Sequence, residues 1–115
     1  MIRIHIRYDR DSREASLELR GHAGQAEVGQ DIVCASASIL AYTVAQIVEA
    51  MHHHGDFVYT PIILLESGRA VIHCKAKDDD IYAEVLHTFF VIQTGYRLLA
   101  HNYPQYVELI TDAEA

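Results

Sequence analysis

The sequence predicts an α+β sandwich, in which an antiparallel sheet of four to five strands carries two long helices on one face. Short segments alternate apolar and polar residues with the period of a strand, and two longer segments repeat apolar residues at helical spacing. The strands are grouped in hairpin-like pairs that the helices separate, which favours an antiparallel sheet over a parallel one. The expected order is β-β-α-β-β-α, with a short further strand near the C-terminal end. At 115 residues, the chain predicts a single domain over 1–115.

Two hairpins account for the expected sheet. Residues 2–8 read IRIHIRY, which places three isoleucines and a tyrosine on one face. A turn-prone DRDS segment follows, and residues 15–20 alternate again before the strand ends near Gly21. Residues 57–66 and 70–75 form the second predicted hairpin, which turns at residues 67–69, and residues 105–110 supply the short final strand.

Two helices are expected, one over residues 32–54, which Asp31 precedes, and one over residues 78–102. The first has an apolar stripe with further apolar residues beside it, so it can pack on two sides, and Gly55 ends it. The second begins with three aspartates, which favour the positive end of a helix dipole, and ends before Pro104.

Composition narrows the function classes. Nine Lys and Arg against sixteen Asp and Glu give a formal charge of −7, which argues against a nucleic-acid-binding surface and suits a basic polypeptide partner. No apolar run approaches the ~20 residues of a membrane span, and the N-terminal segment lacks the apolar core of a signal peptide. We therefore expect a cytoplasmic protein with no membrane contact, whose two cysteines are reduced thiols.

The candidate catalytic residues lie where the first hairpin leads into the first helix. His22 follows a strand, Cys34 lies near a helix start, and a loop over residues 23–30 containing Gly24 and Gly29 separates them. If Asp31 is the N-cap, Cys34 is the third helical residue, where the helix dipole favours a thiolate. A nearby imidazole can take the thiol proton, which makes Cys34 a candidate nucleophile and His22 its general base.

Two residues can support this pair, each with an alternative role. Asp31 either orients His22 as the third member of a triad or caps the helix through backbone N–H groups. Ser38 lies one turn after Cys34 and either donates to substrate and thiolate or bonds back to the helix backbone. We expect the glycine-containing 23–30 loop to move and to gate the site.

One window resembles the signature of the ribosomal-processing cysteine protease family. The residues that carry the resemblance are Gly21-His22-Ala23, Gly29, Asp31-Ile32-Val33-Cys34-Ala35 and Ser38. The remaining chain is similar through its element order and the Tyr103-Pro104 pair after the second helix. Residues 36 and 37 are Ser-Ala where a small residue and then a valine are frequent, which is a conservative departure.

The resemblance implies an α+β homodimer that cleaves the N-terminal extension from a large-subunit ribosomal protein. It makes Cys34 the nucleophile and His22 the base, and such a hydrolysis needs no metal or organic cofactor. Two other functions are compatible with the sequence: a non-catalytic ribosome-assembly or protein-binding module with a structural Cys34, and a thiol-based redox sensor.

Other conspicuous residues have simpler explanations. Cys74 neighbours His73 on a predicted strand, so the two should face opposite sides, with Cys74 in the core. The run His52-His53-His54 suggests a metal site, but successive helical residues point about 100° apart, so three in a row cannot chelate one ion. Their position at a helix C-terminus, which favours positive charge, explains them better.

Overall fold

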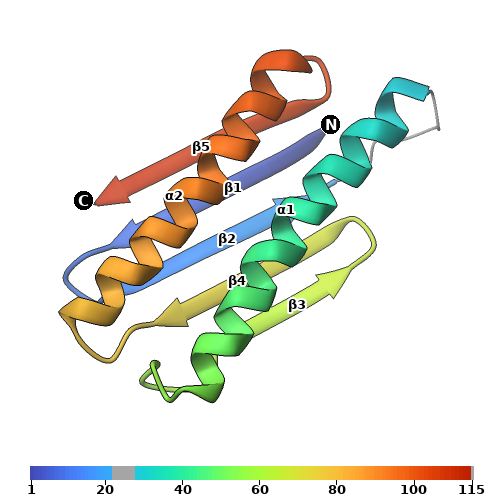
Figure 1. Ribbon diagram of the computed structural model, residues 1–115. Helices are drawn as coiled ribbons and strands as arrows, with labels where there is room; N and C mark the ends of the chain where they lie inside the picture. The colour runs from blue at the N-terminus through green and yellow to red at the C-terminus, as the bar shows by residue number, and fades with distance from the viewer. Residues whose placement is uncertain (22–27, 115) are drawn as a thin grey trace.

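The computed structural model describes residues 1–21 and 28–114, with side chains described over 1–21 and 32–112. Five strands and two helices follow one another in the predicted order. They are β1 (Ile2–Asp9), β2 (Glu14–Arg20), α1 (Val28–His53), β3 (Ile62–Glu66), β4 (Arg69–Lys75), α2 (Asp79–Asn102) and β5 (Val107–Glu114). Both helices lie on the same face of one sheet (Figure 1), which confirms the α+β sandwich.

The sheet has the strand order β3-β4-β2-β1-β5 and is mixed rather than purely antiparallel. The pairs β1–β2, β2–β4 and β3–β4 are antiparallel, as expected, whereas β5 lies parallel to β1. The difference has a topological cause, because α2 carries the chain back to the end of the sheet at which β1 begins (Figure 1). A strand that leaves from there runs in the direction of β1. It is also longer than the predicted 105–110 segment, reaching Glu114.

The period-two pattern of the strands divides the two faces of the sheet. In β1 the apolar residues Ile2, Ile4, Ile6 and Tyr8 are all buried beneath the helices. The residues between them, among them Arg3 and Arg7, lie on the opposite face, which neither α1 nor α2 covers and which we call the uncovered face. The same alternation continues through β2 and β4, so the core lies between the sheet and one side of each helix.

Helix α1 begins earlier than predicted. Its first residue is Val28, so Asp31 is a helical residue rather than the N-cap, and Cys34 lies in the second turn rather than at the third position. A glycine costs a helix interior only about 1 kcal/mol, and Gly29 therefore did not stop the helix. By length and composition, Ile32–His53 could cross a membrane, but Val33, Val44 and Val48 pack in the core.

Helix α2 begins and ends where the sequence predicts. The side chain of Asp78 accepts a hydrogen bond from the backbone N–H of Ile81 at 2.9 Å, which makes Asp78 the N-cap. Asp79 and Asp80 lie in the first turn, where their negative charges interact favourably with the positive end of the helix dipole.

A buried hydrogen bond joins the two helices close to Cys34. The hydroxyl of Tyr96 in α2 donates to the backbone carbonyl of Ala37 in α1 at 2.9 Å, and the ring is completely buried. Tyr96→Phe is expected to lower the free energy of unfolding by about 1 kcal/mol, since the net value of such a bond is about 0.5–1.5 kcal/mol. Tyr103→Phe, which removes a hydroxyl from a partly buried ring, is the matched control and should change stability by less than about 0.5 kcal/mol. Urea unfolding measures both; equal losses would contradict a specific role for the Tyr96 bond.

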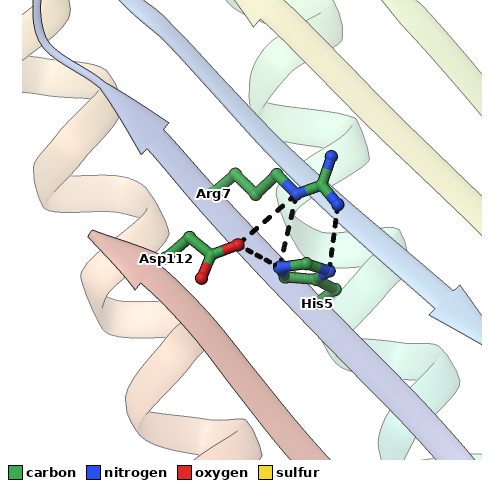
Figure 2. A network of polar contacts seen from close by, with 3 residues as sticks. All are labelled: His5, Arg7 and Asp112. Carbon is green, nitrogen blue, oxygen red and sulfur yellow. Dashed lines mark hydrogen bonds and ion pairs between the residues drawn. The ribbon is translucent and has the colours of Figure 1, made fainter. Parts of the chain in front are cut away.

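Polar contacts join β5 to β1 on the uncovered face (Figure 2). Nε2 of His5 lies 2.7 Å from Oδ2 of Asp112, and Nε of Arg7 lies 3.7 Å from the same oxygen. The Arg7 guanidinium also donates to the His5 ring at 3.3 Å. These side chains connect the first strand to the last and support the parallel pairing of their backbones.

Candidate active site

Cys34 opens into a cavity of about 370 Å³ at the end of the sheet where β2 ends. Three parts of the chain surround it: the first strands, the Cys34 side of α1, and the β3–β4 turn. The lining residues are Ile2, Leu19, Gly21, Cys34, Ala37, Ser38, Ala41, Tyr42, Glu66, Ser67, Gly68 and Ala70. The cavity is large enough for side chains of a peptide, and its walls are mostly small or apolar.

Cys34 and Ser38 are presented together by α1. The two residues are four apart, so their side chains lie one above the other on the same side of the helix, and both are partly buried. Ser36 bonds back to the carbonyl of Ile32 at 2.8 Å. Among the described residues Ser38 has no such partner, so its hydroxyl is available to the cavity.

The second-turn position of Cys34 changes its electrostatics. The influence of a helix dipole falls off within the first turn, so α1 favours a thiolate less than an N-terminal position would. The backbone N–H of Cys34 is also used within the helix, because each helical N–H bonds the carbonyl four residues earlier. That N–H is therefore not free for an oxyanion, whatever the role of Asp31.

Gly21 ends β2 at the cavity and fixes the direction in which the chain leaves the sheet. Its backbone N–H donates to the carbonyl of Gly68 at 3.0 Å, which joins the strand end to the β3–β4 turn. Its φ of +110° is a conformation that residues with a Cβ rarely adopt. A Cβ there would also collide with the carbonyl oxygen of Met1. Only glycine fits this position.

The predicted base and most of the predicted loop lie outside the described residues. This applies to His22, which follows Gly21 directly, and to Gly24. Gly29 and Asp31 are described as backbone within α1, so residues 28–30 are helical and the predicted 23–30 loop is wrong over that part. The pairing of Cys34 with His22 stays a prediction.

Cys74 is a core residue, as predicted. It is fully buried in β4, and burial raises the pKa of its thiol to about 12. Its neighbour His73 faces the uncovered side, where Nε2 lies 2.9 Å from a carboxylate oxygen of Glu14. The two cysteines of the chain therefore differ sharply in access to solvent.

The histidine run lies at the C-terminal end of α1, away from Cys34. Nε2 of His53 lies 3.2 Å from a carboxylate oxygen of Glu49, one turn earlier. Over 1–21 and 32–112, no group of three His, Cys, Asp or Glu side chains is arranged to hold a metal ion.

Several cavity residues were not predicted from the sequence. Tyr42 follows Cys34 and Ser38 at steps of four, so the helical spacing carried a signal for it. Residues 66–68 and Ile2 come from distant parts of the chain, and only the strand register brings them to Cys34.

Comparison with known proteins agrees with this fold. A SMU.848 structure from Streptococcus mutans is 26% identical, with a TM-score of 0.67 over 97% of this chain and 94% of that one. An essential ribosomal processing protease Prp from S. aureus, solved with a covalently linked product peptide, is 23% identical, with a TM-score of 0.69 over 97% of this chain and 100% of that one. The same S. aureus protease with a substrate peptide gives 21% identity and a TM-score of 0.66, with 97% and 100% covered. No curated protein matches. The sequence profile of the family described as cysteine protease Prp matches residues 1–108. The chain therefore belongs to the cysteine protease Prp family and is a cysteine protease.

Proposed function

We propose that this protease removes the N-terminal extension of a large-subunit ribosomal protein, with Cys34 as nucleophile and His22 as general base. The observation that carries the assignment is the cavity: Cys34 lies in it, and so does Gly21, whose next residue is His22. No described residue lining the cavity is a histidine, which leaves His22 as the candidate nearest in sequence to the wall. The processing role is supported by the S. aureus relatives, which are described as ribosomal processing proteases.

The proposed reaction is a two-step acyl transfer. The imidazole of His22 takes the proton of the Cys34 thiol, and the thiolate attacks the peptide carbonyl. The C–N bond breaks, the imidazolium gives its proton to the leaving amine, and a thioester holds the N-terminal fragment. Water, deprotonated by the same imidazole, then hydrolyses the thioester and regenerates the thiol. Every proton and electron pair is accounted for without a metal or an organic cofactor.

Two features of the cavity suit a peptide. Tyr42, which is 50% exposed, offers an aromatic wall for an apolar side chain of the peptide. The hydroxyl of Ser38 lies on the thiol side of the helix and can donate to the peptide or steady the thiolate. Asp31 is a helical residue of α1 rather than its N-cap, and a role for it in orienting His22 stays a prediction.

The test is cleavage of synthetic peptides that copy ribosomal N-terminal extensions, followed by mass spectrometry. The wild-type protein should cut one bond, and Cys34→Ala and His22→Ala should each reduce the rate by more than about a thousandfold, as loss of a nucleophile or its base does. Cys74→Ala is the matched control and should retain activity. Activity that survives in Cys34→Ala would refute the nucleophile assignment. Activity that is lost in Cys34→Ala but retained in His22→Ala would mean that another residue is the general base.

The homodimer and the cytoplasmic location stay predictions. A dimer is supported by apolar side chains that the outer sides of the helices expose, namely Ile39, Ile47, Phe90, Val91 and Leu98. Single exposed apolar residues are common on protein surfaces, whereas several on neighbouring helices are typical of a contact with another protein.

A further inference from the structure

Strand β3 forms one edge of the sheet and lacks the features that usually protect an edge. An edge strand exposes unpaired backbone N–H and C=O groups, and natural proteins guard it with charged side chains, proline or a bulge. β5, at the opposite edge, carries Glu108 and Asp112 between its other residues. β3 reads Ile-Ile-Leu-Leu-Glu, so four apolar residues precede its charged one. The backbone of β3 is therefore open to pairing with a further strand.

Hydrogen bonds on the two sides of β4 show how its backbone groups alternate. The N–H of Ala76, directly after β4, donates to the carbonyl of Arg13 on the β2 side at 2.9 Å. The carbonyl of Lys75, at the end of β4, accepts from the N–H of Val58 on the β3 side at 2.9 Å. Successive residues of a strand direct their backbone groups to alternate neighbours. The odd-numbered residues of β4 therefore bond β3, and the even-numbered residues bond β2.

The register then identifies the backbone groups that β3 leaves unpaired. The odd-numbered residues of β4 lie opposite Ile62, Leu64 and Glu66, so these three residues bond β4. The N–H and C=O groups of Ile63 and Leu65 point outward from the free edge. No residue in the described parts of the chain bonds them. Ile63 and Leu65 thus offer their donors and acceptors in the arrangement that an added strand requires.

Apolar side chains accompany these backbone groups on both faces of the edge. Ile63 and Leu65 lie opposite Ile72 and Ala70, which are core residues, and therefore face the helices. Ile63 is partly buried against the core, whereas Leu65 is 41% exposed. On the uncovered face Ile62 is 53% exposed. An added strand would therefore cover apolar surface on both faces in addition to pairing its backbone.

The free edge leads directly to the Cys34 cavity. The last residue of β3, Glu66, lines that cavity together with Ser67 and Gly68 of the β3–β4 turn. Leu65, which holds the outward groups nearest to the turn, is next to Glu66 in the chain. Figure 1 shows the β3–β4 turn at the end of the sheet where α1, the helix that carries Cys34, begins. A peptide paired along β3 can therefore continue past the turn into the cavity.

We propose that the peptide substrate binds as a sixth strand on the free edge of β3 and is cut where it enters the Cys34 cavity. The chain belongs to a family of cysteine proteases, whose substrates are peptides, and the position of the cut rests on the proposed role of Cys34. In strand addition, backbone hydrogen bonds supply affinity and alternate side chains supply specificity. The peptide residues opposite Ile63 and Leu65 should be apolar, because directly opposite side chains share a face and pack together.

The test is a scan of N-methylated peptides, measured by fluorescence anisotropy with the full-length Cys34→Ala variant, which should bind the peptide without cutting it. The probe is a labelled synthetic copy of a ribosomal N-terminal extension, methylated at one backbone nitrogen at a time. A methyl group on a nitrogen that faces β3 removes a hydrogen bond and blocks close approach, so it should raise the Kd at least about tenfold. On the next residue the same group faces away from β3 and should raise the Kd less than about threefold, which gives a period of two residues.

A proline in β3 tests the same hydrogen bond from the protein side. Leu65→Pro removes the outward N–H, and proline is tolerated on edge strands where the N–H faces solvent. The Kd of the unmethylated peptide should rise at least about fivefold. Leu65→Ala removes the side chain but keeps the N–H, so its Kd should lie at least about threefold below that of Leu65→Pro.

Thr111→Pro is the matched control on the opposite edge. The N–H of Ile2 donates to the carbonyl of Tyr106 at 2.8 Å, so the even-numbered residues of β5 bond β1 and the N–H of Thr111 points outward. Its replacement removes an edge N–H as Leu65→Pro does and should change the Kd less than about twofold. Equal weakening in the two proline variants would contradict the proposal.

Two further results would overturn the proposal. Methylation that weakens binding equally at every position, with the unmethylated peptide still cleaved by the wild-type protein, would refute the sixth strand and leave the proposed function standing. Loss of a dimer in Leu65→Pro on size-exclusion chromatography, with an unchanged Kd for the peptide, would assign the edge to a second copy of this chain. In contrast, a two-residue pattern with a peptide that the wild-type protein does not cleave would support the sixth strand and refute the proposed substrate.

Discussion

Iodoacetamide at pH 8 is expected to alkylate Cys34 in the folded protein and to leave Cys74 unmodified. Only the thiolate reacts, and the pKa of Cys74 is raised to about 12 by burial. About one part in ten thousand of its thiol is then ionised at pH 8, and the core must open before even that fraction meets the reagent. Cys34 lines an open cavity and is only partly buried, so the reagent can reach it without any opening of the core. We expect the two rates to differ by more than about a thousandfold.

Peptide mapping by mass spectrometry measures the selectivity, and denaturant supplies the control. In about 6 M guanidinium chloride, which exposes both thiols, the two cysteines should react at comparable rates. Modification of the folded protein should also abolish peptide cleavage in proportion to the labelling of Cys34. Equal labelling of both residues in the native state would contradict the placement of Cys74 in the core. Resistance of Cys34 would support a structural cysteine in place of the nucleophile.

Gly21→Ala is expected to destabilise the protein by several kcal/mol and to abolish cleavage in the molecules that remain folded. The added Cβ collides with the carbonyl oxygen of Met1, which belongs to the backbone and cannot turn aside. The positive φ adds a conformational penalty of about 1–2 kcal/mol. Relief requires the strand end to move, and that movement breaks the hydrogen bond from Gly21 to Gly68 at the cavity wall.

Gly55→Ala is the matched control for the backbone penalty alone. Gly55 has a φ of +76°, and no atom lies within 4 Å of the position that its Cβ would take. We expect it to cost about 1 kcal/mol and to leave cleavage unchanged, because it lies beyond the far end of α1. Thermal unfolding and the rate of peptide cleavage distinguish the two variants. Similar behaviour of both would mean that Gly21 matters only for its backbone conformation.

The sequence predicted the elements of this fold because their patterns are local. Alternation in residues 2–8 identified a strand and the buried face of that strand, and the aspartates at 78–80 located the start of α2. The direction of β5 could not be predicted in this way, since the same alternation suits a parallel and an antiparallel neighbour. The start of α1 was misplaced because Asp31 is a good capping residue, whereas the helix continues through Gly29 to Val28.

The sequence indicated the reactive residues of the candidate site but not most of the other residues that line its cavity. Cys34 and Ser38 follow from one helical segment and from the family motif, and both line the cavity. Glu66, Gly68 and Ile2 reach the same cavity from other strands, through a register that no short window of sequence reveals. Cys74 was separable from Cys34 because its neighbours alternate as in a buried strand.

The parallel pairing of β1 with β5 has a consequence for how the protein folds. His5 and Asp112, which meet across these strands, are 107 residues apart in the chain. Closing so long a loop lowers the chain entropy before the contacts between the strands can offset the loss. Such pairings therefore form late and slowly. During synthesis β1 can join β2 at once, whereas its other edge stays open until residues 107–114 have left the ribosome. Until then that edge is free to pair with another chain, which makes the nascent protein most vulnerable to aggregation just before its last strand arrives.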